Sequence, residues 1–412
     1  MRSVRKICKS LISAIAAVLF LGGNIAAHPH PTALDTDLMP YPFWTDPQND
    51  DIYHVPTGTR LSFDGMMDVL SGGRVIYVGE THNNVHSHRM QLEIIKDLSR
   101  RYPGRIAIGM EMFREPQQES LDLWTAGKLS EPSFLKKSEW FENWSSDFGY
   151  YREIMNFARE NSVDIFALNP PIELQRAYGM SSAEDMHPDL TADLPSIDSS
   201  DPYHRAMVKA YYGSHEGGEG MEEAFLRVQL LWEEHMAERI TEYLGSPRGE
   251  GKIMVVLAGG AHVKYGFGIP KKVMRRMPLP YYVVLPANIS SPEEEPEGEK
   301  LYMKVEIPEI PLLSGDFIWA VPYDLLEENR VLMGIRMKSH EDSVIVDEVL
   351  ENSPASAAGL LPGDRLLALD DLTIEVMADV RIVMGSKQVG DSVSVVVQRG
   401  TEELRLSASF KE

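Results

Sequence analysis

Residues 74–95, RVIYVGETHNNVHSHRMQLEII, place a glutamate and three histidines directly behind a short run of apolar residues. The run RVIYVG predicts a buried strand, because a continuous apolar, β-branched segment that ends in glycine is typical of parallel sheets. A helix is expected next, since apolar residues follow at helical spacing at Met90, Ile94, Ile95 and Leu98. Glu80 and His82 therefore lie at the carboxyl end of the predicted strand.

The same alternation of strand and helix continues along most of the chain. Helices are expected at 150–162 and 221–244, and further apolar strand segments at 105–113, 163–169, 252–257, 281–286 and 315–322. Such alternation predicts an α/β fold in which helices cover both faces of a mainly parallel sheet, a three-layer α/β/α sandwich. We expect this domain to span residues 61–323.

Four further segments, two before the α/β domain and two within it, differ from it in composition. Residues 1–27 combine four cations with the apolar run LISAIAAVLFLGG and are expected to be a secretory signal peptide, or else an uncleaved anchor. A polar lead-in (28–60), a helical or flexible insertion (180–220) and an acidic loop (288–312) are expected as well. We therefore expect a protein secreted across the inner membrane, periplasmic or extracellular, without a stable membrane span.

Cysteine content and net charge limit which ligands and partners the protein can have. Cys8, within the predicted signal peptide, is the only cysteine, so the mature chain is expected to have no disulfide and no thiolate ligand. The net charge of −22 argues against nucleic acid as a partner.

Polar side chains follow several of the predicted strands. Ligands of open parallel sheets bind beyond the carboxyl ends of the strands, where this sequence has Glu80, His82, Glu111, Asn169 and His262. Two carboxylates and two imidazoles are a plausible set of ligands for a divalent metal, or an acid/base pair for hydrolysis. His82 and His262 each end a G-x-x-H motif, and we expect them within about 10 Å of each other if they share one site. The alternative is that each is a buried histidine satisfied by its neighbours.

Five longer sequence blocks, which include both G-x-x-H motifs, resemble those of a known family. VIYVGETHNNVHSHRMQ, IGMEMF, YYREIMNFARENSVDIFALNPP, VQLLWEEHMAERI and VVLAGGAHVKYGFGIPKKV occur in order within residues 60–322. They resemble the ChaN-like haem-binding proteins, which belong to a wider group with Tiki, TraB and erythromycin-esterase proteins. The resemblance implies an α/β/α sandwich whose functional cleft contains Glu80, His82, Glu111 and His262. A lipoprotein cysteine, usual in ChaN, is missing, which puts membrane anchoring in doubt.

The resemblance suggests further haem-binding candidates. Tyr150, Tyr151 and Tyr265 are candidate ligands of ferric haem, with packing as the alternative. Arg89 can pair with a propionate or a carboxylate of the site, or be a solvated helix residue. His86 and His88 are expected at the surface or behind the site.

From about residue 325 the sequence changes to short strands separated by turns, which predicts a smaller β-rich domain at 325–412. The segment 351–371, ENSPASAAGLLPGDRLLALDD, resembles the core of PDZ domains. The resemblance implies that Leu332, Met333, Gly334 and Ile335 bind the C-terminus of a partner peptide. A groove filled from within the same protein is the alternative.

These observations lead to one main hypothesis and two alternatives. The main one is an exported haem- or iron-binding protein of the ChaN type that acts in haem or iron uptake and whose PDZ domain binds a partner peptide. The second is a metal-dependent hydrolase or peptidase in which Glu80 or Glu111 acts as general base beside Mn, Co or Zn. The third is a binding protein without catalytic activity. A homodimer is a possible assembly.

Overall fold

The computed structural model describes residues 47–144, 146–180, 186–212, 219–289, 312–326, 331–340 and 343–411. The predicted signal peptide, residues 28–46 of the lead-in and nearly all of the predicted acidic loop lie outside these ranges. The chain forms two compact units. The larger consists of Met1–Gly127 and Trp144–Leu326, and the smaller of Lys128–Asn143 and Glu327–Glu412.

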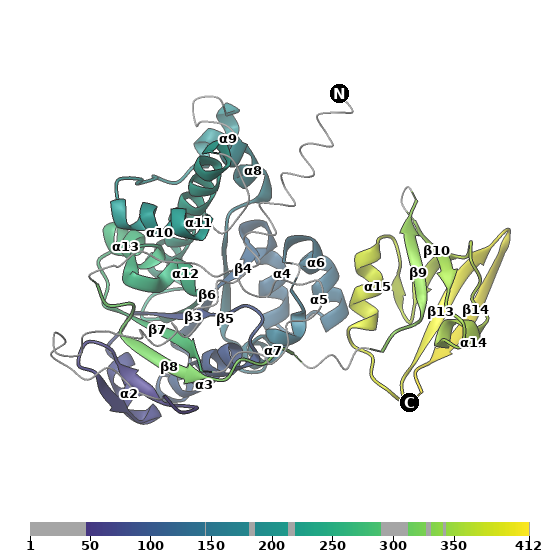
Figure 1. The fold of residues 1–412 in the computed structure, drawn as a ribbon, viewed down its shortest axis with the longest axis horizontal. Helices are drawn as coiled ribbons and strands as arrows, with labels where there is room; N and C mark the ends of the chain where they lie inside the picture. The colour runs from purple at the N-terminus through teal and green to yellow at the C-terminus, as the bar shows by residue number, and fades with distance from the viewer. Residues whose placement is uncertain are drawn as a thin grey trace. The chain divides into compact units, whose positions relative to one another are not determined.

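The larger unit contains an eight-stranded, mainly parallel sheet (Figure 1). The order is β2 (Thr59–Leu61), β1 (Ile52–His54), β8 (Phe317–Val321), β7 (Tyr281–Asn288), β3 (Val75–Glu80), β6 (Ile253–Gly259), β4 (Ile106–Arg114) and β5 (Asp164–Asn169). The strands from β8 to β5 are parallel, and β1 and β2 extend the β8 edge in antiparallel pairing. The predicted α/β class and mainly parallel sheet are confirmed.

Two groups of helices enclose this sheet, one on each face (Figure 1). The first group packs around α3 and consists of α2 (Phe63–Leu70), α3 (Val85–Arg101), α4 (Gln118–Thr125) and α7 (Arg152–Glu160). The second packs around α11 and consists of α8 (Ile172–Met180), α10 (Pro202–Tyr212), α11 (Glu219–Gly245) and α13 (Ile269–Arg276).

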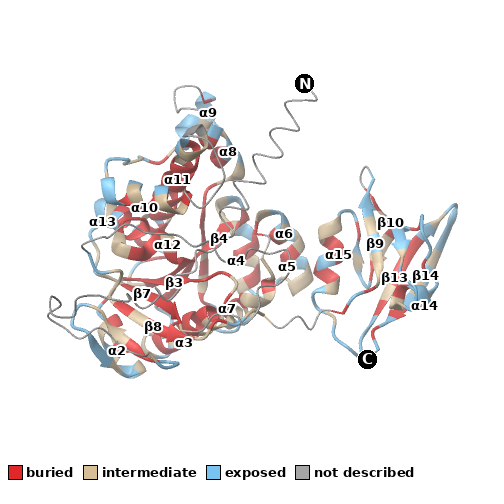
Figure 2. Ribbon diagram, in the orientation of Figure 1, coloured by how far each residue is buried: buried red, intermediate tan, exposed pale blue. Residues whose placement is uncertain are grey.

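Alternation along the central strands explains why both faces are covered. Val75 and Tyr77 of β3 join the core cluster formed with α11 and α13, whereas Ile76 and Val78 are equally buried but lie outside that cluster. Successive strand residues point to opposite faces, so an apolar run buries both. Figure 2 shows the resulting buried layer through the centre of the unit.

Two expected segments take more definite forms in the structure. Part of the predicted lead-in is structural, because β1 pairs with β8 and buries Ile52. The described parts of the predicted insertion are largely helical, with α9 (Pro188–Ala192) and α10, in agreement with the helical alternative. Within the described ranges, no helix has the length and apolar character needed to cross a membrane.

The smaller unit contains an antiparallel sheet. Its order is β14 (Glu402–Ser409), β13 (Ser392–Arg399), β11 (Arg365–Leu369), β10 (Val344–Val349) and β9 (Ile335–Ser339), and β12 (Leu372–Thr373) pairs with β11. Helices α14 (Pro354–Ala358) and α15 (Met377–Met384) accompany the sheet, and Val380 and Val383 of α15 enter its core. The β-rich second domain is thus present.

Two helices from within the larger domain's sequence belong to this smaller unit. They are α5 (Glu131–Lys137) and α6 (Trp140–Asn143), and α5 packs on α15. Lys136 Nζ donates to Glu375 Oε2 (3.0 Å) and to the Thr373 carbonyl (3.3 Å), and lies 3.3 Å from Asp379 Oδ1. Residues 128–143, predicted to lie in the larger domain, therefore belong to the smaller unit.

Candidate functional site

Strand order brings the predicted site residues together. Strand β6 lies between β3 and β4, and Gly259 at its end is in register with Glu80 of β3. The end of β6 is therefore flanked by Glu80 on one side and Glu111 of β4 on the other. This arrangement places both G-x-x-H motifs at the same end of the sheet.

Glu80 is the centre of the first part of the site. Its buried carboxylate accepts hydrogen bonds from His82 Nδ1 (2.6 Å) and Tyr151 Oη (2.7 Å) on Oε1, and from Gln91 Nε2 (2.7 Å) on Oε2. Burial favours the neutral acid, but His88, His82 and the Tyr151 hydroxyl outweigh it and lower the pKa of Glu80 to about 2. Glu80 is therefore a carboxylate anion at neutral pH.

The ring of His82 is oriented by this contact. Burial lowers the pKa of His82, but the hydrogen bond from Nδ1 to Glu80 raises it more, so the net shift is upward. The other ring nitrogen, Nε2, has no hydrogen-bond partner among the described residues and faces Gly259. A Cβ atom on Gly259 would lie 3.0 Å from Nε2, so a larger residue would require the ring to shift by a few tenths of an ångström. Trp144 covers the ring edge-on, with centroids 5.0 Å apart.

Glu111 links the two G-x-x-H motifs. Its Oε2 accepts a hydrogen bond of 2.6 Å from the Gly259 amide, and its Oε1 lies 3.5 Å from His262 Nε2. Asn169, at the end of β5, donates from Nδ2 to the Glu111 carbonyl at 2.6 Å. Burial raises the pKa of Glu111, but His262 and the other donors lower it overall.

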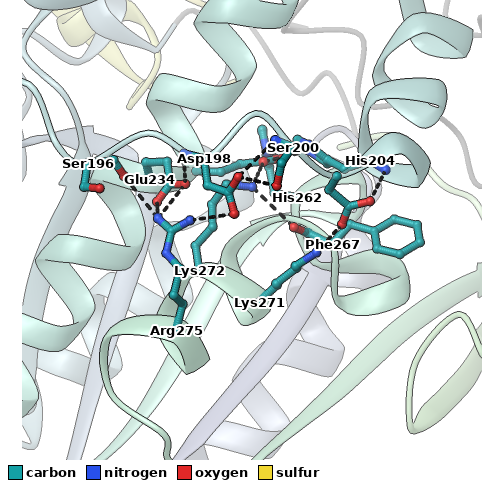
Figure 3. Close-up of polar contacts among 12 residues, drawn as sticks. Ser196, Asp198, Ser200, His204, Glu234, His262, Phe267, Lys271, Lys272 and Arg275 are labelled. Atoms are coloured by element: carbon teal, nitrogen blue, oxygen red, sulfur yellow. Dashed lines mark hydrogen bonds and ion pairs between the residues drawn. The ribbon is translucent and has the colours of Figure 1, made fainter.

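Glu233 of α11 completes the site and was not among the predicted residues. It is buried and lies 3.2 Å from His262 Nδ1, 2.8 Å from Lys272 Nζ and 2.8 Å from His204 Nε2. Figure 3 shows His204, His262 and Lys272 among the residues of this polar network. Burial lowers the pKa of His262, but Glu111 and Glu233 raise it to about 10, so this ring is an imidazolium at neutral pH.

The sequence contained a signal for Glu233. The run VQLLWEEHMAERI places two adjacent glutamates inside an otherwise apolar stretch of helix. Both are buried, and Glu234 forms ion pairs with Arg275 and Arg276 of α13. Buried carboxylates require such partners.

The other predicted residues lie in different places. Tyr151 and His88 contact the site, since His88 Nε2 lies 3.0 Å from the His82 carbonyl. Arg89 is paired with Asp50 instead, and Tyr150 Oη accepts a hydrogen bond from the Leu326 amide. The remaining two, His86 and Tyr265, contact Asp324 and Phe267 respectively. The roles of all these residues in ligand binding stay predictions.

The pKa values of the two site carboxylates limit their use as general bases. Glu80 and Glu111 are strongly hydrogen-bonded anions with lowered pKa values, which makes them weak general bases at neutral pH. No group of three or more His, Cys, Asp or Glu within the described part of the chain is arranged to hold a metal ion. The group best suited to bind iron is His82 Nε2, because a carboxylate that holds the other ring nitrogen is the usual support of a ligating histidine.

The predicted peptide groove lies at the open edge of the small sheet. Strand β9 is the last strand and pairs only with β10 among the described strands. Before it, the amides of Met333 and Gly334 have no hydrogen-bond acceptor among the described residues. Gly334 adopts φ +77°, and a Cβ there would lie 2.2 Å from Ser353 Cβ. Glycine is thus required at this position by Ser353 and by the backbone conformation. Leu332 is 76% exposed.

A family model described as haem-binding uptake, Tiki superfamily, ChaN matches residues 66–273, half of the chain. The protein therefore belongs to this ChaN-like haem-binding family. A PDZ domain model matches residues 331–409. The match extends through β9 and the sheet of the smaller unit.

Individual relatives agree with this two-part organisation. A solved structure, "Cofacial heme binding to ChaN of Campylobacter jejuni", is similar over 69% of this chain and 100% of that chain, with a TM-score of 0.50 and 17% identity. At this identity the likeness concerns the fold alone. Two curated proteins, both named "Putative zinc metalloprotease", match shorter stretches. The protein from Agrobacterium fabrum is 43% identical over 76 residues (18% of this chain, 20% of that protein), and the protein from Mesorhizobium japonicum is 38% identical over 66 residues (16% and 17%). The chain spans about a fifth of these two relatives.

Proposed function

We propose that the larger unit binds haem and that His82 Nε2 is the iron ligand. The observation that carries this proposal is the geometry of His82: Glu80 holds Nδ1, while Nε2 has no hydrogen-bond partner among the described residues and lies against Gly259. A neutral imidazole nitrogen is a common axial ligand of haem iron. Bound haem would supply an iron centre for storage, transfer or redox chemistry. Membership of a haem-binding family supports the same reading.

The experiment is a titration of the purified protein with haemin, followed by the Soret absorption band. We expect a shifted band that saturates at a fixed number of haems per chain. His82→Ala should remove it, whereas His86→Ala should retain it, because His86 contacts Asp324 outside the site. An unchanged spectrum in wild-type protein would overturn haem binding, and an unchanged shift in His82→Ala would overturn the assignment of the ligand.

We further propose that the protein is exported and acts in haem or iron uptake, which the predicted signal peptide and the family description support. The N-terminal sequence of the protein recovered from extracytoplasmic fractions tests export and cleavage after Ala27. Growth with haem as the sole iron source, with and without the protein, tests uptake. The mass of the haem-loaded protein distinguishes a monomer from a homodimer.

For the PDZ domain we propose binding of a partner's free C-terminus. The amides of Met333 and Gly334 offer donors to a terminal carboxylate, and the open edge of β9 can pair with an extended peptide. Peptides with an apolar last residue, free or amidated at the C-terminus, provide the test on the full chain. Amidation should remove most of the affinity, because charge-assisted hydrogen bonds are lost. Equal affinity would show that the loop does not bind a carboxylate.

A further inference from the structure

Residues 198–204, which lead into helix α10 and form its first residues, are joined to helix α13 by ion pairs. Asp198 Oδ2 lies 3.0 Å from Arg275 Nη1, and Asp201 Oδ2 lies 2.6 Å from Lys271 Nζ. Figure 3 shows the first of these pairs. We call residues 198–204 the strap, because polar contacts fasten this segment to the helices beside it.

Apolar contacts hold the chain on either side of the strap. Ile197, directly before it, packs against two small apolar clusters, and Val208 and Tyr212, later in α10, belong to one of them. Within the strap, Tyr203 stacks on Phe267 with ring centroids 6.1 Å apart, yet it remains 47% exposed. The strap is therefore a mainly polar segment between two apolar attachments, and such segments open locally at low cost.

Separation of the strap would leave both buried carboxylates of α11 paired. Glu233 and Glu234 each contact two cations outside the strap, which are Lys272 with His262, and Arg275 with Arg276, respectively. Lys271, the strap's partner on α13, has 53% of its side chain exposed and can be hydrated when Asp201 leaves. Unpaired buried charges make the loss of an ion pair costly, whereas partly exposed pairs contribute little. The strap can therefore open without destabilising the helices beneath it.

The strap ends on the carboxylate that contacts His262. His204 Nε2 lies 2.8 Å from Glu233 Oε2, and His262 Nδ1 lies 3.2 Å from Glu233 Oε1. All three residues are at most 5% exposed. Movement of His204 with the strap would therefore uncover Glu233 and, with it, the His262 side of the site.

We propose that the strap is a lid that opens by releasing its ion pairs to α13 and admits a ligand to the His262 side of the site. Its role in ligand entry rests on the haem binding proposed above, whereas its opening does not. Ile197 at one end and Val208 at the other stay in place, so that the strap moves between two fixed points.

Hydrogen exchange in the haem-free full chain tests the opening. The Asp198 amide donates to Glu234 Oε1 at 3.0 Å, and this bond breaks when the strap separates from α11. Lys271→Met should speed exchange of this amide by up to about fivefold, the effect of losing one partly exposed ion pair, and Lys271→Arg should restore the slower rate. Lys209→Met is the matched control, because Lys209 pairs with Glu222 in the part of α10 that stays in place. Unchanged exchange in Lys271→Met, or an equal rise throughout α11, would overturn the inference.

Stopped-flow association of haemin tests the role in ligand entry. The association rate should rise in Lys271→Met by the same factor as exchange of the Asp198 amide, and it should stay unchanged in Lys209→Met. Faster exchange with an unchanged association rate would show that ligands do not enter beneath the strap, and would overturn that role. A wild-type protein that binds no haemin would refute the proposed function, while hydrogen exchange would still decide whether the strap opens.

Discussion

His82 and Trp144 meet edge-on, with ring centroids 5.0 Å apart and planes at 83°. Both side chains are about 5% exposed, and the indole covers part of the imidazole. Trp144 therefore acts as a cover over the proposed iron ligand.

Trp144→Ala should increase the rate of haemin association severalfold, because the cover over His82 is removed. The substitution should also cost about 3–5 kcal/mol of stability, as large-to-small core substitutions do. Stopped-flow absorbance in the Soret region measures the rate. Trp124→Ala is the control, since Trp124 is equally buried but contacts Arg159 instead. Equal rates in the two variants would show that Trp144 does not control access.

Glu80→Gln should weaken both the fold and haem binding. The change removes the negative charge that accepts hydrogen bonds from His82 and Tyr151. Breaking a buried ion pair costs about 3–5 kcal/mol, and loss of the carboxylate behind a ligating histidine typically weakens binding about 10–100-fold. Urea unfolding and haemin titration measure the two effects. Glu93→Gln, on α3 and with 43% of its side chain exposed, should change neither.

Stability should fall with rising pH above neutrality because of His262. Its pKa of about 10 in the folded protein exceeds its ordinary value of 6.5. The stabilisation is therefore complete below pH 6.5 and is lost as the pH rises through 10, with a slope of up to about 1.4 kcal/mol per pH unit. Urea unfolding between pH 6.5 and 10 should show this slope in wild-type protein and not in His262→Gln. An unchanged slope in the variant would assign the effect to other groups.

Gly334→Ala and Gly359→Ala separate two causes of strain in the PDZ domain. Both glycines have positive φ, +77° and +83°, which costs alanine about 1–2 kcal/mol. A Cβ on Gly334 also meets Ser353, whereas one on Gly359 meets nothing within 4 Å. Gly334→Ala should therefore be more destabilising by a further 1–3 kcal/mol or so, the usual cost of overpacking. Equal unfolding free energies would mean that Ser353 moves aside freely.

Lys136→Met should destabilise helix α15. Lys136 is the cation beside the buried carboxylate of Asp379, which is otherwise bonded to the amides of Glu375 and Val376. Because Lys136 is partly exposed, the expected loss is about 1 kcal/mol. Hydrogen exchange of the α15 amides should be faster in Lys136→Met and unchanged in Lys128→Met, whose side chain is exposed. Identical exchange would indicate that α5 does not stabilise α15.

Much of the fold could be predicted from hydrophobic patterns in the sequence. Apolar runs such as the one that forms β3 predicted the strands, and polar residues at their ends predicted the position of the site. The order of the strands could not be predicted, because pairing between β3 and β6 joins residues far apart in the chain. Only that order shows that Gly259 makes room for His82.

The partners of charged residues were the least predictable feature. Arg89, which the sequence suggested as a partner of a propionate or of a carboxylate of the site, is bound to Asp50 instead. Glu233 was missed because its three basic partners come from three separate segments. Such pairings depend on tertiary contacts that no local pattern contains.

The position of α5 and α6 has a consequence for how the two units are connected. Residues 128–143 leave the larger unit and return to it, and residues after 326 leave it again. The chain therefore passes between the units three times, and Asn143 at the end of α6 is bonded directly to Trp144, the residue that covers His82. A single cut by a protease near residue 327 would leave α5 and α6 attached to the larger unit, still able to retain the PDZ domain through α15. A gene fragment encoding the PDZ domain alone would instead lack α5, the helix that packs on α15.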